Sequence, residues 1–219
     1  MVPPRKPRKS GSRQAASSRK TPRRASTSPP VPPPGADAEV SARITFREVG
    51  RSTRADLVKL FERRGGPKWC WCMAWRPLDG DRAKAPAPAR KRALLGLVDS
   101  GVPVGILGYL DEEPVAWCSV APRSTHLELG GPGRDDDVWS ITCFFVLRDF
   151  RGAGLMKRLL GAAVETARAR GARVVEAYPV DPDSPSYRFM GFVPAFEERG
   201  FIEDRRVGTR RHVMRLVLD

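Results

Sequence analysis

The sequence predicts one α/β domain, because strand-like and helix-like segments alternate along most of the chain. Short apolar segments of strand length are separated by segments in which apolar residues recur every three or four positions. The clearest helical segment runs from Leu155 to Arg170, where Leu155, Leu159, Ala163 and Ala167 share one line. Three strand-like segments precede it in quick succession, which is typical of an antiparallel meander.

The predicted elements follow the order βααβββαβαββ. A capping box of Thr53 and Asp56 predicts the start of the first helix, and Gly171 predicts the end of the long one. Pro86 and Pro88 restrict the second helix to the later part of its segment. In chain order the segments are a strand over 44–49, a helix after Thr53, a short helix within 84–98, strands over 104–110, 115–120 and 138–146, the helix over 155–170, a strand over 173–180, part helix over 184–199, and a strand pair over 201–203 and 212–218.

The first 43 residues differ in composition from the rest and predict a disordered basic arm. They hold ten Lys or Arg against two acidic residues, so they carry +8 of the formal charge of +14. They also contain PPVPPPG and almost no large apolar side chain, so they cannot bury enough surface to offset their ordering entropy. The arm either makes a weak electrostatic contact to nucleic acid or an acidic partner, or is a solvated extension. The folded domain is then expected over 44–219.

Cysteine usage and hydropathy point to a cytoplasmic protein. The four cysteines are sparse for 219 residues, and no apolar signal segment precedes them, so reduced thiols are expected. No apolar run approaches the ~20 residues of a membrane-spanning helix, so no membrane partner is expected.

A glycine-containing turn joins the strand over 138–146 to the helix over 155–170. Its residues, Arg151-Gly152-Ala153-Gly154, place unpaired backbone N–H groups at the positively polarised start of a helix. Glycines let the backbone approach a phosphate, and Arg151 adds positive charge, so the turn predicts a pyrophosphate site. A solvated turn without a ligand is the alternative. A P-loop is excluded by the missing Gly-Lys-Ser/Thr, and a dinucleotide fold is disfavoured by the meander before the turn.

This turn and the order of elements resemble the GNAT superfamily of acyl-CoA-dependent N-acetyltransferases. The family signature is Arg or Gln, two residues, Gly, one residue, then Gly or Ala. Arg151 and Gly154 match it, whereas Met156 replaces the last small residue. The resemblance spans 44–219 and includes Gly200-Phe201 as a candidate for the family's late Gly-Phe pair. It implies a mixed, mostly antiparallel central sheet flanked by helices, with a splay between the two central strands.

The resemblance also implies where acetyl-CoA binds. The backbone of the strand before the turn would pair with the pantetheine arm like an added strand, and the N–H groups of the turn would meet the diphosphate. The implied residues are Phe144, Phe145 and Val146 on the strand and Arg151, Gly152, Ala153, Gly154, Leu155 and Met156 in the turn.

Candidates for acid and base are less clear. In many family members a Tyr four residues before the Gly-Phe glycine protonates the leaving thiolate; counted from Gly200, that position is Phe196. Tyr187 and Tyr178 are substitutes, although each could be a packing residue. Glu176 lies inside an apolar strand and is our first candidate for the base, because burial would raise its pKa toward a range useful for catalysis. The alternative is that Glu176 is an edge or solvent-facing residue of this strand.

The segment KWCWCMAWR, residues 68–76, predicts the acceptor pocket. Its tryptophans could wall an apolar or cationic acceptor, and Arg76 could bind a carboxylate. The alternative is aromatic packing at a helix junction. Cys70 and Cys72 lack the usual spacing of a zinc pair and two further ligands, so no metal is predicted. The candidate acceptor residues are Trp69, Trp71, Trp75 and Arg76.

Together these patterns predict an acetyl-CoA-dependent N-acyltransferase that transfers an acetyl group directly to a small-molecule or peptide amine in a ternary complex. It would be a monomer or a homodimer. A noncatalytic acyl-CoA-binding or nucleic-acid-associated module is the alternative, because of Phe196 and the basic arm.

Overall fold

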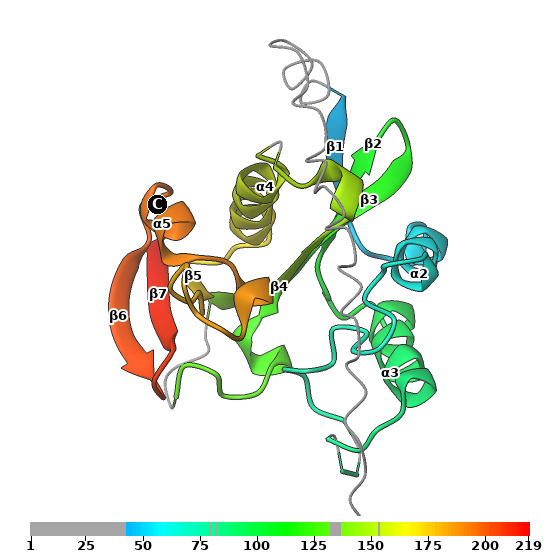
Figure 1. The fold of residues 1–219 in the computed structure, drawn as a ribbon, viewed down its shortest axis with the longest axis horizontal. Coiled ribbons are helices and arrows are strands. Elements are labelled where there is room, and N and C mark those ends of the chain that lie inside the picture. Colours follow the sequence, from blue (N-terminus) through cyan, green and yellow to red (C-terminus); the bar gives the residue numbers. More distant parts are fainter. Residues whose placement is uncertain (1–42, 79, 82, 132–136, 153) are drawn as a thin grey trace, which may run out of the picture. The chain divides into compact units, whose positions relative to one another are not determined.

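The computed structural model describes residues 43–219 except 79, 82, 132–136 and 153. The predicted arm over 1–43 therefore lies outside the described residues, apart from Arg43 at its end. The described elements alternate as the sequence predicts, β1 α2 α3 β2 β3 β4 α4 β5 α5 β6 β7, with three short 3-10 helices between them (Figure 1). No helix within the described ranges is long and apolar enough to cross a membrane.

The seven strands form one mixed sheet in the order β1-β2-β3-β4-β5-β7-β6. Every neighbouring pair is antiparallel except β4 and β5, which are parallel because α4 connects them. The mostly antiparallel sheet predicted from the sequence is thus present. The strands are β1 Ile44–Glu48, β2 Ile106–Leu110, β3 Glu113–Pro122, β4 Val138–Val146, β5 Val174–Ala177, β6 Ile202–Val207 and β7 Arg211–Val217.

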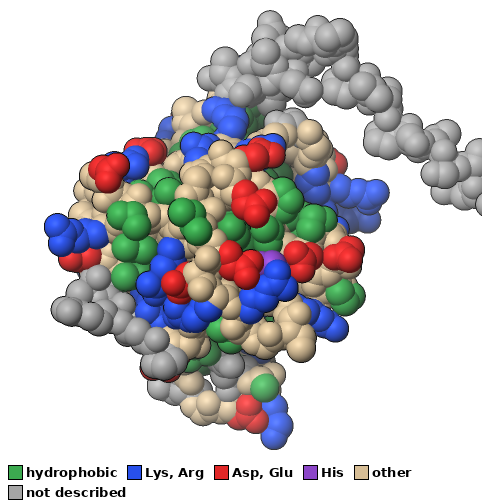
Figure 2. All heavy atoms as spheres, turned by 90° about the vertical axis from the view of Figure 1, so that its left-hand side faces the viewer, with side chains coloured by type: hydrophobic (Ala, Val, Ile, Leu, Met, Phe, Trp, Pro, Cys, Tyr) green, Lys and Arg blue, Asp and Glu red, His purple; other side chains and the backbone are tan. Residues whose placement is uncertain are grey.

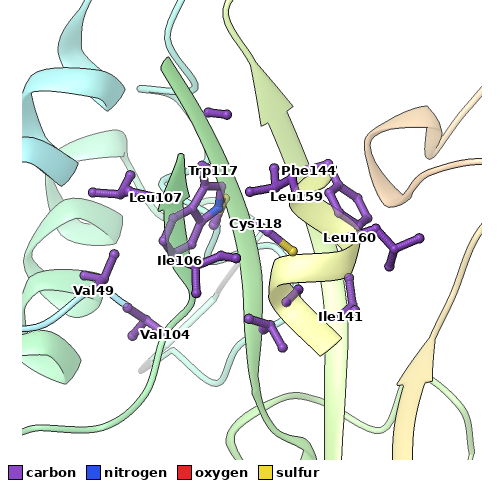
Figure 3. Packing of buried hydrophobic residues seen from close by; sticks show 14 of the residues in the cluster. Val49, Val104, Ile106, Leu107, Trp117, Cys118, Ile141, Phe144, Leu159 and Leu160 are labelled. Carbon is purple, nitrogen blue, oxygen red and sulfur yellow. The ribbon is translucent and has the colours of Figure 1, made fainter. Parts of the chain in front are cut away.

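Helices cover both faces of the sheet. Helices α2 and α3 lie on one side of β4 and α4 lies on the other (Figure 1). Within β3, Trp117 and Cys118 point to opposite faces, as successive strand residues must (Figure 3). Trp117 packs edge-on against Phe61 of α2, with ring centroids 5.5 Å apart. The helices are α2 Arg54–Glu62, α3 Ala87–Asp99, α4 Leu155–Ala169 and α5 Val193–Glu197, and the 3-10 helices are η1 Arg123–Thr125, η2 Arg148–Phe150 and η3 Arg188–Met190.

Helix α4 packs on the sheet through the predicted line of small and apolar residues. Leu159 and Ala163 are fully buried, and Leu159 and Leu160 lie beside Ile141 and Phe144 of β4 (Figure 3). The helix ends at Ala169, one residue before the predicted end, and Gly171 follows with a positive φ of 82°. This packing fixes the position of the helix start relative to the end of β4.

Two local details differ from the sequence prediction. The Thr53 side chain does not cap α2; its hydroxyl bonds Glu48 and Gly50 instead, and the Asp56 carboxylate accepts a 2.9 Å hydrogen bond from Tyr109. The capping box is therefore replaced by contacts between the helix and the sheet. Helix α3 also starts earlier than expected, because Pro88 lies in its first turn, where a missing N–H costs nothing.

Candidate functional site

The two central parallel strands separate partway along β4. Their pairing runs from Val138↔Val174 to Ile141↔Ala177 and then stops, whereas β3 stays paired to β4 as far as Val146. Beyond Ile141 the edge of β4 toward β5 therefore has no strand partner among the described residues. The predicted pantetheine-binding residues Phe144, Phe145 and Val146 all lie on this stretch. An extended ligand arm can add to such an edge through main-chain hydrogen bonds.

The glycine turn follows directly after this strand. Gly152 and Gly154 have positive φ angles of 93° and 68°, and Gly154 is the N-cap of α4. A Cβ atom built on either glycine would meet nothing within 4 Å, so the space above the turn is open. The N–H groups of Leu155 and Met156 belong to the first turn of this 15-residue helix, the end that attracts anions. Ala153, also predicted here, lies outside the described residues.

Arg151 links the turn to the strand. Its Nε donates a 2.9 Å hydrogen bond to the carbonyl oxygen of Val146. The rest of the side chain is largely exposed and leaves guanidinium N–H groups for an anion. The geometry at the helix start therefore suits a diphosphate, which supports the interpretation of the turn made from the sequence.

The aromatic segment over 68–76 does not converge on one pocket. Trp71 is 2% exposed and packs against Phe61, with ring centroids 5.1 Å apart. Trp69 is 75% exposed and, together with Trp71, lines a hollow of about 610 Å³ beside α3. Trp75 is not among the residues that line this hollow, and its ring lies 5.8 Å from that of Tyr187, another predicted site residue. The packing alternative thus describes Trp71, and Trp75 remains a candidate for acceptor contact.

Arg76 points into the protein interior. It is fully buried, and it donates to Thr125 Oγ1 at 3.1 Å and to the Val104 carbonyl oxygen at 3.1 Å. Burial lowers the pKa of its guanidinium to about 10. We therefore withdraw the assignment of Arg76 to an acceptor carboxylate, since a ligand in a surface pocket cannot reach a fully buried side chain.

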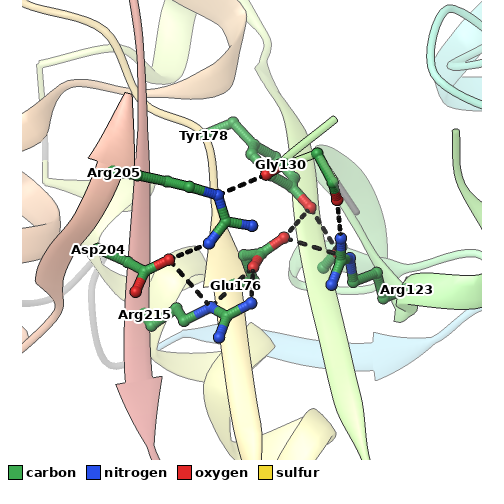
Figure 4. Close-up of polar contacts among 9 residues, drawn as sticks. Arg123, Gly130, Glu176, Tyr178, Asp204, Arg205 and Arg215 are labelled. Carbon is green, nitrogen blue, oxygen red and sulfur yellow. Dashed lines mark hydrogen bonds and ion pairs between the residues drawn. The ribbon is translucent and has the colours of Figure 1, made fainter. Parts of the chain in front are cut away.

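Glu176 occupies the centre of a buried ion-pair network (Figure 4). One carboxylate oxygen accepts two hydrogen bonds from Arg215, at 2.8 and 2.6 Å, and the other accepts a 2.6 Å bond from the Tyr178 hydroxyl. Arg123 Nε lies 3.4 Å from this second oxygen. Glu176 is fully buried rather than an edge residue, and both of its oxygens already have partners.

Tyr178 and Glu176 extend this network to β4. The Tyr178 hydroxyl lies 3.0 Å from Ser140 Oγ, and burial, together with the nearby Glu176 charge, raises the pKa of this phenol. Further along β4, Thr142 Oγ1 lies 3.4 Å from His126 Nε2. Burial lowers the pKa of His126 well below its ordinary value, with the Arg76 charge as a second cause. A row of polar side chains therefore lies along the sheet face where β4 and β5 separate.

Two of the four cysteines, Cys72 and Cys143, lie in close contact. Cys72 Sγ lies 3.6 Å from Cys143 Sγ and accepts a hydrogen bond from Trp117 Nε1 at 2.9 Å. Over the described part of the chain, no group of three or more His, Cys, Asp or Glu side chains could hold a metal ion.

Comparison with known proteins identifies the class that this architecture defines. The model of the GNAT acetyltransferase family matches residues 56–192, well over half of the chain. The chain is a member of the GNAT family of acetyltransferases. Acetyl-CoA is the acyl donor of this family, and the open glycine turn and unpaired β4 edge fit it. A search of curated protein sequences found no match.

Solved structures share the fold at low sequence identity. A protein from Bacillus halodurans aligns with a TM-score of 0.53 at 14% identity, covering 80% of this chain and 83% of its own. The ribosomal-protein-S5-alanine acetyltransferase of Vibrio fischeri aligns with 0.51 at 11%, covering 80% and 93%. A Salmonella typhimurium protein solved with its cofactor acetyl-CoA aligns with 0.51 at 15%, covering 81% and 95%.

Three arginines near the candidate site were not identified from the sequence. Arg123 and Arg215 bind Glu176, and Arg211 stacks on Trp75 with its guanidinium carbon 5.1 Å from the ring centroid. Arg215 lies opposite Glu176 in the β5–β7 register, so only the strand pairing reveals the partnership. In a chain with 39 Lys and Arg, composition gave no means to single these three out.

Proposed function

We propose that this chain is an N-acetyltransferase that transfers an acetyl group from acetyl-CoA to an amine, directly, within a ternary complex. The observation that carries the proposal is the separation of β4 from β5 beyond Ile141↔Ala177, immediately before an open glycine turn at the start of α4. The catalytic domain is taken as residues 44–219. The bound thioester supplies an activated carbonyl, and the residues of this chain bind the two substrates and move the protons.

Residues of β4 and α4 would bind the donor. The free edge over Phe144–Val146 offers main-chain donors and acceptors to the pantetheine amides. The N–H groups of Gly152–Met156 and the guanidinium of Arg151 would hold the diphosphate. Met156 is partly buried against the core, so a side chain larger than the usual Gly or Ala is accommodated beside the turn. It need not occupy the open space above the glycines.

Tyr187 is our candidate for the acid that protonates the leaving thiolate. The family match ends at Gly191-Phe192 and does not include Gly200-Phe201, so the earlier pair is the better counterpart of the family's Gly-Phe. Tyr187 stands four residues before Gly191, the position at which many family members have this tyrosine. Phe196 is fully buried, with its ring 5.2 Å from Phe201, and is explained as a core residue. Phe196 therefore does not favour a noncatalytic module.

The local structure around Tyr187 suits a catalytic side chain. Its backbone is left-handed, with φ 60°, an uncommon conformation for a residue other than glycine that tends to occur at functional sites. The side chain is 38% exposed, and the following 3-10 helix brings Gly191 against the ring of Phe144 on β4. The segment that begins at Tyr187 therefore packs on the free part of β4 through Gly191, where the thioester would lie.

Trp75 would form the wall of the acceptor pocket next to Tyr187, whereas Trp69 and Trp71 lie elsewhere.

Glu176 is a candidate base only if other groups carry the proton to it. Glu176 is fully buried, and so is Tyr178, whose hydroxyl bonds it at 2.6 Å, so Glu176 would act as a base only through a relay of Tyr178 and a further group or water. Otherwise Glu176 is a positioning residue that holds β5, β7 and the segment after β3 together through Arg215 and Arg123.

Turnover would be tested by measuring release of the CoA thiol from acetyl-CoA with a panel of amines and the full-length chain. Acetylated amine should appear by mass spectrometry in equal amount to the released thiol. Thiol release without an acetylated product would indicate hydrolysis, and the absence of release with every amine would contradict the proposal.

A further inference from the structure

A small pocket lies beside Tyr187 and is formed mainly by the β6–β7 hairpin. Its volume is about 250 Å³, below the 300–1,000 Å³ typical of sites for drug-sized ligands, so it suits a molecule about as large as an amino acid. It adjoins Trp75, because Arg211 lies against both the Trp75 ring at 5.1 Å and the Tyr187 ring at 5.9 Å. The lining residues are Tyr187, Val207, Gly208, Thr209, Arg210 and Arg211.

Positive charge at this pocket is not compensated by the described residues. The Arg211 guanidinium lies against two aromatic rings and has no ion-pair partner among the described residues, and Arg210 donates to Ser186 Oγ at 2.8 Å. Nearby Arg188 donates to two backbone carbonyl oxygens, of Pro182 and Ser184. None of these three guanidiniums has a carboxylate partner in the described part of the chain, and no acidic residue appears among the described residues that line the pocket.

The rest of the hairpin shows the opposite arrangement. Arg206 pairs with Glu203, and Arg215 pairs with Glu176. On the molecular face that includes β6, acidic and basic side chains are interspersed (Figure 2). The unpaired arginines are therefore a local exception beside the candidate acid Tyr187.

Two buried donors in the same place also need an acceptor. Arg211 Nη1 and Trp75 Nε1 are buried, and no described group accepts a hydrogen bond from either atom. Buried N–H groups nearly always have a partner, which is water or a ligand when the protein provides none. A guanidinium that is stacked on an aromatic ring and free of protein carboxylates matches the planar, bidentate geometry of a carboxylate ligand.

We infer that the acceptor amine carries a carboxylate, as an amino acid or a short peptide does, and that Arg211 binds this carboxylate in the hairpin pocket. This inference rests on the proposed function and names the acceptor class for it. Arg211 takes the role that the sequence suggested for Arg76. Binding of the carboxylate at Arg211 would hold the rest of the acceptor between Trp75 and Tyr187, next to the free edge of β4.

A binding experiment tests this without requiring turnover. Calorimetric titration of the full-length chain with N-acetyl-L-phenylalanine and with N-acetyl-L-phenylalaninamide compares two product-like molecules that differ only in the carboxylate. We expect the acid to bind at least about tenfold more tightly, as for a charge-assisted pair. Arg211→Gln should remove the difference and Arg211→Lys should keep part of it, while the matched control Arg206→Gln, on the same hairpin but paired with Glu203, should keep all of it.

The outcomes separate this inference from the proposed function. Equal affinity for acid and amide, no binding of either, or an unchanged preference in a folded Arg211→Gln variant would overturn the carboxylate site. Folding of each variant is checked by its melting temperature. If amines are acetylated without regard to a carboxylate, the site is wrong and the function stands. If the acid binds through Arg211 but no amine is acetylated, the site stands and the function is wrong.

Discussion

Arg215 donates two hydrogen bonds to a single oxygen of Glu176, at 2.8 and 2.6 Å, from the strand that pairs directly with β5. Because Arg123 and Tyr178 contact the other oxygen, the fully buried carboxylate connects β5 to β7 and to the segment that follows β3. Removing one partner from a buried ion pair leaves the other charge uncompensated, which is far more costly than losing an exposed pair. Glu176 is therefore expected to contribute more to the stability of the fold than to catalysis.

The first prediction concerns this carboxylate. Glu176→Gln keeps the side-chain shape but removes the charge, and should reduce the free energy of unfolding by about 3–5 kcal/mol. Urea denaturation measures the change. Glu198→Gln is the matched control, since its pair with Lys157 is more than half exposed and should contribute little. Equal stability of the two variants would mean that the buried network does not hold the strands together.

The second prediction concerns the glycine turn. Gly154→Val should weaken binding of CoA by at least about tenfold, because a branched side chain resists a φ of 68° and would fill the open space above the turn. Calorimetry with CoA measures the affinity. Gly171→Val is the control, since Gly171 has a similar φ of 82° and open surroundings at the other end of α4. Comparable CoA affinity in both variants would rule out the turn as the diphosphate site.

The order of elements and the glycine turn could be predicted from the sequence because they depend on local patterns. The line of Leu155, Leu159, Ala163 and Ala167 is visible in the sequence and is the face that α4 buries. Partnerships across the sheet could not be predicted, because they depend on register. In the sequence Arg76 was a candidate for binding a ligand carboxylate, yet it is fully buried. Arg211 did not stand out among the many arginines of the chain, yet it stacks on Trp75.

The candidate acid could not be located from the sequence for a different reason. Two Gly-Phe pairs lie nine residues apart in the sequence, at Gly191 and Gly200, and counting from the later one pointed to Phe196. Only the extent of the family match and the burial of Phe196 favour the earlier pair. A spacing rule is therefore only as good as the anchor residue from which it is counted.

The third prediction concerns the pH dependence of stability. Burial lowers the pKa of His126 well below the ordinary value of 6.5, so below about pH 6.5 the unfolded chain binds a proton that the folded chain does not. The stability that this histidine contributes is therefore present above pH 6.5 and is lost as the pH falls. The slope should approach about 1.4 kcal/mol per pH unit. Urea denaturation between pH 7.5 and about 5 should show it, and His126→Gln should remove this part of the slope; a slope that persists unchanged would assign the effect to other groups.

The last prediction concerns the leaving thiolate. Tyr187→Phe should lower kcat by about 10²–10⁴ if the phenol donates the proton, and it should leave CoA affinity nearly unchanged. Tyr178→Phe is the comparison, because the Tyr178 hydroxyl is buried and already donates to Glu176, so its loss should appear in stability more than in kcat. Rates of thiol release, together with CoA titrations and melting temperatures, distinguish the two variants. If Tyr187→Phe keeps full kcat, Tyr187 is not the acid, and a loss of kcat in Tyr178→Phe without loss of stability would then assign Tyr178 a part in the proton path.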